Sequence, residues 1–117
     1  MAEWLFDRNG TPQIIVDGNC FRSVRGTVIG WVQGKNAYSL GGSHLGWYEG
    51  GVLYDDNNRA IGFCNNATGY LPSRPGLAGT PGMPGFAGTP GRPGLAGTPG
   101  RAGYGGWSDM SLESFFG

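Results

Sequence analysis

Apolar and polar positions recur with a period of sixteen residues along residues 4–66. Written in blocks of sixteen, this part of the chain aligns without a gap as WLFDRNGTPQIIVDGN, CFRSVRGTVIGWVQGK, NAYSLGGSHLGWYEGG and VLYDDNNRAIGFCNN. Three columns of this alignment stand out: Ile15, Trp31, Trp47 and Phe63; Gln13, Ile29, Leu45 and Ile61; and Ile14, Gly30, Gly46 and Gly62. Such agreement over four blocks indicates a structural unit that is repeated four times.

Dipeptides rich in glycine and asparagine divide each block in two, because they recur every eight residues. They are Asn9-Gly10, Asp17-Gly18, Arg25-Gly26, Gln33-Gly34, Gly41-Gly42, Glu49-Gly50, Asn57-Asn58 and Asn65-Asn66. Glycine and asparagine tolerate the positive φ that two-residue hairpin loops need. The six residues left between turns match the usual strand length. The pattern predicts a meander of strands over residues 3–8, 11–16, 19–24, 27–32, 35–40, 43–48, 51–56 and 59–64.

The turns also predict which residues face one another across the strands. On one face we expect Phe21 opposite Gly30, Ala37 opposite Gly46, and Leu53 opposite Gly62. On the other face we expect Trp4 opposite Ile15, Phe6 opposite Gln13, Tyr38 opposite Leu45, Tyr54 opposite Ile61, and Val52 opposite Phe63; Ile29, Trp31 and Trp47 share this face. Glycine opposite a side chain lets strands coil and approach closely. We therefore predict an all-β fold, a shallow closed barrel with pseudo-fourfold symmetry, whose closure removes unpaired strand edges.

The period changes after Arg74, where glycine occupies every third position. The ten glycines in phase are Gly76, Gly79, Gly82, Gly85, Gly88, Gly91, Gly94, Gly97, Gly100 and Gly103. Within this run, the large apolar residues Leu77, Phe86 and Leu95 recur every nine residues. Polyproline II has three residues per turn, and only glycine fits the axis of a collagen triple helix. A flexible linker has no need of this phase. We expect a homotrimeric collagen-like rod of about 90–100 Å. A polyproline II strand packed against copies and a disordered segment are the open alternatives.

The C-terminal stretch WSDMSLESFFG is strongly apolar and predicts a short helix, with Ser108 as its N-cap and Asp109 in its first turn. A helix of this length is marginal alone, so it must dock on a neighbouring chain or on its own head. The predicted organisation is a β head over residues 1–66, a linker over 67–73, a Gly-X-Y segment over 74–106 and the helix over 107–117. The residues expected to carry self-association are the ten glycines with Leu77, Phe86, Leu95, Trp107, Phe115 and Phe116.

Composition narrows the classes of function. Glycine supplies 25 of the 117 residues, and the formal net charge is zero, so no overall field attracts nucleic acid. No apolar run is long enough for a transmembrane segment, and the first residues lack a signal-peptide pattern. The compartment therefore stays open between the cytoplasm and the cell surface or exterior. Cys20 and Cys64 lack the spacing of a metal site, and we favour two buried thiols over a disulfide.

Catalytic chemistry needs a constellation of groups, and none is visible in this sequence. His44 is the only histidine and is expected on the surface. Asp55 and Asp56 flank a turn, where Asp56 can pair with Arg59. We therefore expect a non-enzymatic protein without metal or cofactor. Trp31, Trp47 and Phe63 are either core residues or the bowl of a lipid or glycan site, and a structure that covers both indoles would contradict the bowl.

The elements LFDRNG, VLYDDNN and IGW/IGF resemble those of the bacterial four-fold β-flower family over residues 3–66. This resemblance implies hairpin petals around a pseudo-symmetric axis, and some relatives are similar to lipid-binding tubby-like barrels. Arg22 stands where the other blocks have Phe6, Tyr38 and Tyr54. A second resemblance, to YD-type repeats, rests on Tyr54-Asp55. The expected role is a structural protein that self-assembles through its Gly-X-Y segment and displays the head; a lipid- or glycan-binding module is the alternative.

Overall fold

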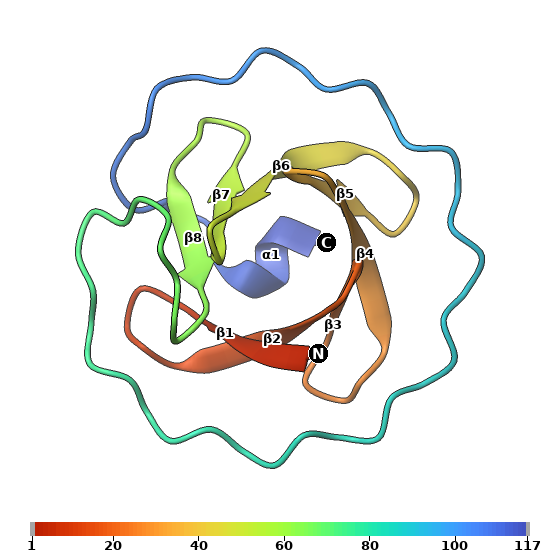
Figure 1. Cartoon of the computed structure of the whole chain (residues 1–117), viewed down its shortest axis with the longest axis horizontal. Helices are drawn as coiled ribbons and strands as arrows, with labels where there is room; N and C mark the ends of the chain where they lie inside the picture. Colours follow the sequence, from red (N-terminus) through yellow and green to blue (C-terminus); the bar gives the residue numbers. More distant parts are fainter. Residues whose placement is uncertain (1, 117) are drawn as a thin grey trace.

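The computed structural model describes residues 2–116, which form a closed antiparallel barrel with one short helix (Figure 1). The strands are β1 (Ala2–Phe6), β2 (Pro12–Asp17), β3 (Cys20–Arg22), β4 (Val28–Gln33), β5 (Asn36–Ser39), β6 (His44–Glu49), β7 (Val52–Asp55) and β8 (Ala60–Phe63), and the helix is α1 (Leu112–Phe116). Each strand pairs with its neighbour in the chain, and β1 pairs with β8 through Phe6 and Phe63 to close the ring. The predicted all-β barrel of eight strands is confirmed.

The hairpins β1–β2, β3–β4, β5–β6 and β7–β8, here called petals, share one irregularity. In the first petal, the Gly10 N–H donates to the Asp7 carbonyl (2.9 Å) and Gly10 has a φ of 80°. The loop therefore holds three residues rather than two, which moves the register by one residue. A bulge moves it back between Leu5 and Phe6, and the other three petals have their register shift at the equivalent place.

This irregularity decides which of the predicted pairs form. The pairs nearer the barrel axis are confirmed: Phe21–Gly30, Ala37–Gly46, Leu53–Gly62, Trp4–Ile15 and Val52–Phe63. Those between the bulge and the tip are wrong: Phe6 faces Pro12, Tyr38 faces His44 and Tyr54 faces Ala60. The extra residues Gln13, Ile29, Leu45 and Ile61 lie in the bulges. Ile29, Leu45 and Ile61 consequently join the core inside the barrel rather than the outer face.

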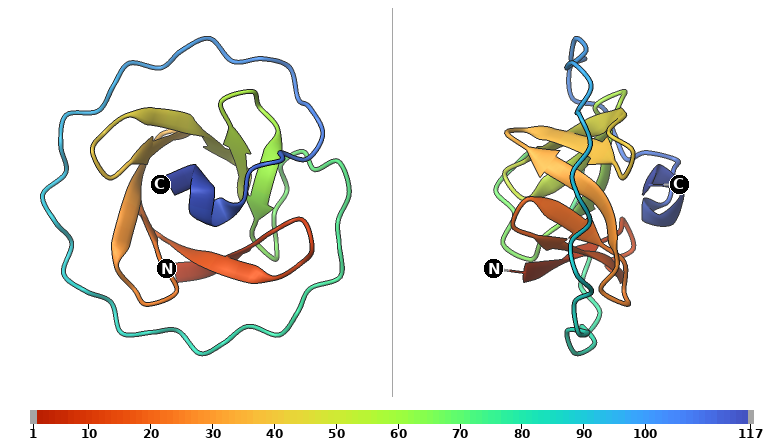
Figure 2. Two further views of the ribbon diagram at one scale, coloured as in Figure 1. Left: turned by 180° about the vertical axis from the view of Figure 1, so that it is seen from behind. Right: turned by 90° about the vertical axis from the view of Figure 1, so that its right-hand side faces the viewer.

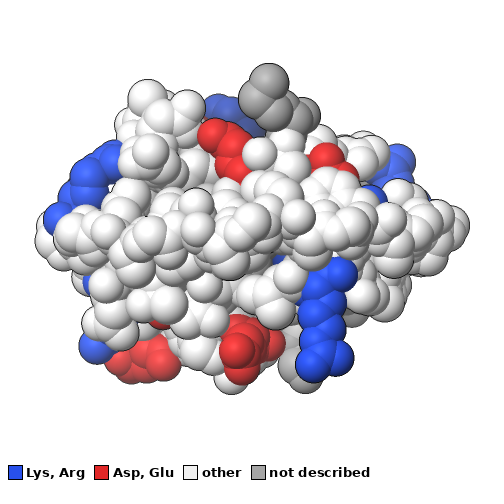
Figure 3. Space-filling view, turned by 90° about the horizontal axis from the view of Figure 1, so that it is seen from below, with Lys and Arg blue, Asp and Glu red and all other residues white. Residues whose placement is uncertain are grey.

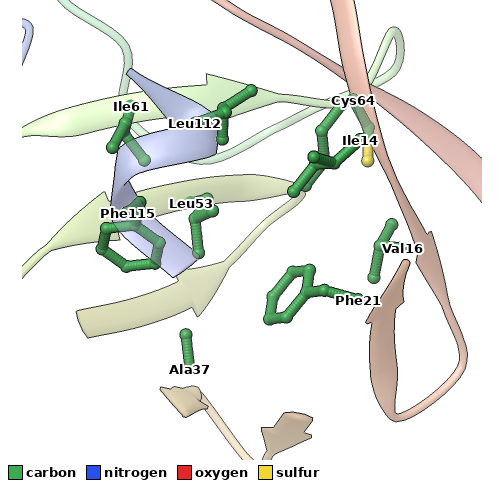
Figure 4. Close-up of a cluster of buried hydrophobic side chains, with 10 residues drawn as sticks. Ile14, Val16, Phe21, Ala37, Leu53, Ile61, Cys64, Leu112 and Phe115 are labelled. Carbon is green, nitrogen blue, oxygen red and sulfur yellow. The ribbon is translucent and has the colours of Figure 1, made fainter. Parts of the chain in front are cut away.

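The helix α1 closes one end of the barrel (Figures 1 and 2). Its Leu112 and Phe115 are buried among the inward side chains of the strands, such as Leu53 and Ile61 (Figure 4). The glycine column makes room for the helix, because a Cβ on Gly62 would lie 3.0 Å from the Leu112 side chain. The sequence left open whether the helix docks on a neighbouring chain or on its own head. In the structure it docks on its own head.

The helix is shorter than predicted, and its N-cap is different. Ser111 caps it, since the Ser114 N–H donates to the Ser111 hydroxyl oxygen at 3.1 Å. Ser108 lies before the helix, and its hydroxyl donates to the Asp55 carboxylate at 2.7 Å. The prediction that Ser108 is the N-cap is wrong, because its hydroxyl oxygen accepts a hydrogen bond from the Met110 N–H (3.1 Å) in a turn that precedes the first helical residue, Leu112.

Residues 74–106, here called the belt, encircle the barrel outside the petals instead of leaving it as a rod (Figures 1 and 2). The belt up to residue 105 contains neither helix nor strand. An extended chain of this length covers about 100 Å at ~3.1 Å per residue, which is close to the perimeter of a molecule 37 × 36 × 22 Å in extent. The expected separate rod is corrected by this arrangement, in which the Gly-X-Y segment finds its partners within its own chain.

Candidate functional site: the belt and the capped end of the barrel

The belt and the petals are joined by a repeated backbone hydrogen bond. The Ala78 N–H donates to the Gly10 carbonyl (2.8 Å), and the other bonds are Ala87 to Gly26 (3.2 Å), Ala96 to Gly42 (3.0 Å) and Gly105 to Asn58 (3.1 Å). The acceptors are sixteen residues apart and the donors nine residues apart. Nine belt residues therefore cover the same arc as one sixteen-residue petal. The sixteen-residue period of the head and the nine-residue period of the belt therefore follow the same fourfold repeat of the structure.

The glycines at the petal tips are required by this contact. A Cβ on Gly26 would collide with the Gly85 carbonyl oxygen of the belt, and Gly26 has a φ of 87°. Gly10 and Gly42 are crowded in the same way by the carbonyls of Gly76 and Gly94. In the fourth petal Asn58 takes the position with a φ of 60°, which asparagine tolerates better than most residues.

The ten belt glycines that were expected to carry self-association lie in a different environment. A Cβ built on any one of Gly76, Gly79, Gly82, Gly85, Gly88, Gly91, Gly94, Gly97, Gly100 and Gly103 would meet no atom within 4 Å. None of the ten has a positive φ. The contact between the belt and the head therefore does not require glycine at these ten positions.

Belt side chains nine residues apart lie against the petals. The Phe86 ring stacks on the Arg22 guanidinium, whose central carbon is 4.4 Å from the ring centroid. Leu95 packs against the buried cluster that holds Trp31 and Tyr38. Tyr104 lies with its ring centroid 5.4 Å from that of Tyr54. Phe86 and Leu95 were expected to contact other copies of the chain, whereas in the structure they contact the petals of their own chain. Tyr104 was not predicted, although it continues the same nine-residue spacing.

The other residues expected in self-association have separate positions. Leu77 begins this series beside the Gly10 tip and is partly exposed. Trp107 packs against the aromatic cluster of the barrel, where its ring centroid is 6.1 Å from that of Phe63. Phe115 is buried in the barrel and Phe116 stacks on Phe21, with ring centroids 4.8 Å apart. The apolar C-terminal residues thus fill their own head.

Arg22 fastens the belt from the side of the head. Its Nε lies 3.0 Å from an Asp17 carboxylate oxygen, and its Nη1 donates to the carbonyls of Gly26 (2.6 Å) and Ala87 (2.9 Å). The side chain is 5% exposed. A charge this well buried needs a partner and a full set of acceptors. The departure of Arg22 from the aromatic column is explained, because this side chain bonds the belt and the petal tip together.

Arg101 belongs to the belt and binds it to the head. Its guanidinium carbon lies 5.3 Å from the Trp47 ring centroid, 5.2 Å from Tyr54 and 5.3 Å from Tyr104. The Arg101 side chain also donates to Glu49, through Nη1 at 2.9 Å. Hydrogen bonds from Lys35, then Arg101 and Tyr104, lower the pKa of Glu49 to about 2. These cation–π and charge-assisted contacts hold the last quarter of the belt.

The bowl of aromatic residues expected for a lipid or a glycan is not formed. Trp31 is 2% exposed, Trp47 is 3% exposed and Phe63 is fully buried. The Trp31 indole N–H donates to the Leu40 carbonyl at 3.1 Å. Both indoles are covered by the chain itself, so these aromatics serve the packing between petals and belt. Their burial corrects the expectation of an open ligand platform.

The titratable side chains singled out in the sequence are held in structural contacts. His44 bonds Asn36 at 3.0 Å and lies edge-on to Trp47, and burial lowers the pKa of His44 while Asp56 partly offsets this shift. Asp55, rather than Asp56, binds the Arg59 backbone N–H (2.9 Å). Cys20 and Cys64 are buried free thiols, and burial raises the pKa of Cys64 to about 11.

Within residues 2–116, no group of three or more histidine, cysteine, aspartate or glutamate side chains could hold a metal ion. No helix in this described part combines the length and the apolarity that crossing a bilayer requires. On the face shown in Figure 3, acidic and basic side chains are scattered over a largely uncharged surface. Among the described residues, the candidate binding sites are therefore concave surfaces rather than a metal centre or a large charged patch.

Two cavities open beside α1 at the capped end of the barrel. The larger, about 390 Å³, lies between the first petal and the segment that leads into the helix, and the smaller, about 320 Å³, lies between α1 and the second petal. They share Gln13 and Glu113 in their linings, so they form one surface feature, here called the α1 groove. Its further lining includes Asp7, Arg8, Ile14, Val24, Ile29, Trp107, Asp109, Met110 and Phe116.

A family model described as a 4-fold beta flower protein matches residues 3–116. The match extends beyond the petals, to which the sequence resemblance was confined, and includes the belt and α1. No curated protein and no solved structure matches the chain.

Proposed function

The chain belongs to the 4-fold beta flower family, and we propose that it is a non-enzymatic structural module whose Gly-X-Y segment is an intramolecular belt for its own head. The observation that carries this proposal is the match between nine belt residues and one petal, repeated at four tips by backbone hydrogen bonds. A linker or an independent rod would have no reason to keep this ratio. The predicted role in structure is retained, whereas the partner of the Gly-X-Y segment becomes the head of the same chain.

The belt, together with Trp107 directly after it, also completes the hydrophobic packing of the head. The outward aromatics Trp47, Tyr54 and Phe63 are buried in one cluster against which Trp107 packs, and Leu95 covers a second cluster around Trp31. Without these covers the head would present contiguous apolar surface, which soluble monomers rarely expose. The belt is therefore part of the folded unit, and the module is a disc of 37 × 36 × 22 Å.

Removal of one triplet separates this proposal from a homotrimeric rod. Deletion of Thr80-Pro81-Gly82 keeps glycine at every third position but breaks the nine-residue match with the petals. We expect the full-length chain to be a monomer by light scattering, and the deletion to lower its melting temperature by about 5 °C or more. The substitution Thr80→Ala, which keeps the belt length, is the control. A trimer whose melting is unaffected by the deletion would contradict the belt and support the rod.

A lipid- or glycan-binding module built on Trp31, Trp47 and Phe63 would require the belt to leave the head, because these side chains are covered. Binding of a lipid or glycan that is abolished by Trp31→Ala, with the melting temperature unchanged, would favour that alternative. We expect instead that Trp31→Ala destabilises the fold, since large-to-small substitutions of buried aromatics cost about 3–5 kcal/mol.

A further inference from the structure

The capped end of the barrel is only partly filled by α1. Four equivalent bulge positions surround this end, and Leu45 and Ile61 pack with Ile29 against the same core as the helix. The fourth position is the polar Gln13, which lines the α1 groove together with Ile14. Ile14 stands where the other three repeats have glycine. The fourfold repeat is therefore broken at the groove.

The groove has an apolar half and an acidic half. Ile14, Val24, Ile29 and Phe116 line the smaller cavity, and Val24 is 50% exposed there. The larger cavity is bordered by Asp7, Asp109 and Glu113 and by one cation, Arg8. The Arg8 guanidinium is directed to the Ser108 carbonyl at 3.4 Å. Three carboxylates against one guanidinium favour a positively charged ligand group.

We infer that the α1 groove binds an extended peptide segment of a partner protein, in which an apolar side chain and a lysine or arginine point to the same side. The apolar side chain occupies the cavity between Val24, Ile29 and Phe116. The basic side chain lies in the larger cavity, near Glu113 and Asp109. Glu113 borders both cavities, so the two side chains are neighbours, and alternate residues of an extended strand lie about 7 Å apart on one side.

Charge complementarity, together with the apolar and acidic halves of the groove, favours a ligand that carries both an apolar and a basic side chain. An anionic ligand would meet three carboxylates, and a purely apolar ligand would leave the acidic half without a partner. The carboxylates of Asp109 and Glu113 belong to exposed residues, so their attraction for a basic side chain is screened by salt. Asp7 is less available, because it accepts hydrogen bonds from Asn9, Thr11 and Gln13.

The test is an NMR titration of the full chain with the peptide acetyl-Leu-Gly-Lys-Gly-amide, followed through the Trp107 indole and the Val24 amide. Two control peptides replace leucine by glycine or lysine by glutamate. We expect shifts at both reporters with the first peptide, a dissociation constant that rises with ionic strength, and binding weaker by about tenfold for either control peptide.

Matched variants locate the binding. Glu113→Lys is expected to weaken the binding by about tenfold, whereas Asp56→Lys, which changes the net charge equally at a residue outside the groove lining, changes it by less than about twofold. Both residues are exposed, so neither variant is expected to unfold the protein. Equal effects of the two variants, no binding of the peptide, or binding only to neutral lipid vesicles would each overturn the inference. None of these outcomes bears on the belt, which is tested by mass and melting.

Discussion

The Arg22 guanidinium lies over the Phe86 ring, with its central carbon 4.4 Å from the ring centroid. One residue belongs to the second petal and the other to the belt. Arg22 also bonds Asp17 and the carbonyls of Gly26 and Ala87. A single side chain therefore joins an ion pair, a petal tip and the belt.

Arg22→Met is expected to destabilise the protein strongly, because it removes the ion pair with Asp17 and the hydrogen bond to the Ala87 carbonyl, and leaves the Gly26 carbonyl with only the Ala87 N–H. Removing one member of a buried ion pair costs about 3–5 kcal/mol, and the 27% exposure of the Asp17 side chain places the expected loss at the lower end of that range. Urea unfolding measures this loss. Arg25→Met, at the exposed tip of the same petal, is the control, and equal unfolding midpoints for the two variants would contradict the anchoring role.

Glycines of the petal tips and of the belt are expected to respond oppositely to alanine. Gly26→Ala places a methyl group against the Gly85 carbonyl at a positive φ, and should destabilise by more than about 1 kcal/mol. Gly88→Ala meets open space and should be neutral or stabilise by about 0.4–1 kcal/mol through the unfolded state. Thermal melting compares the two.

Gly18→Ala separates the cost of the positive φ from the cost of the collision with the belt. Gly18 has a φ of 59° but open space around it, so only the backbone cost applies there. The same comparison distinguishes belt from rod. Replacement of one glycine disrupts a triple helix, so a large loss of stability in Gly88→Ala would speak for the rod.

The helix is expected to contribute to stability in spite of its length. Phe115→Ala removes a buried ring from the core inside the barrel and should cost about 3–5 kcal/mol. Met110→Ala, at an exposed residue before the helix, should change the free energy of unfolding by less than about 0.5 kcal/mol. If guanidinium chloride unfolding gives the same midpoint for both variants, the helix is not docked in solution.

Stability is expected to fall in acid through Glu49. The pKa of Glu49 is lowered to about 2 in the folded protein by hydrogen bonds from Lys35, Arg101 and Tyr104, whereas an unfolded glutamate titrates near its ordinary value of about 4.3. The unfolded chain therefore binds the proton first, and the contribution of Glu49 is complete above about pH 5 and is lost as the pH falls toward 2. Melting temperatures across this interval measure the effect. Glu49→Gln should flatten the dependence, and an unchanged slope would contradict it.

The fold of the head was largely predictable because residues close in sequence determine its turns and pairings. Turn residues every eight positions and the pairing of Phe21, Ala37 and Leu53 with glycines determine strand number and the register near the axis. The three-residue loops were missed, because a dipeptide such as Asn9-Gly10 fits a two-residue loop equally well, and the compensating bulge leaves the alternation unchanged beyond it.

The belt was harder to predict, because glycine at every third residue describes a local conformation and not its partner. A triple helix and a belt share this pattern. The distinguishing signals were the nine-residue spacing that continues to Tyr104, and the substitution of Arg22 in an otherwise aromatic column. The ligand platform failed for a related reason: Trp31 and Trp47 have the composition of a binding site, but their surroundings are supplied by a segment far along the chain.

The order of segments along the chain has a kinetic consequence. The petals are made of contacts close in sequence, which form rapidly, and during synthesis they emerge before the belt. The belt can find its four tips only when the petals exist, and α1 follows it into the barrel. Assembly from the first residue to the last therefore needs no rearrangement of earlier parts.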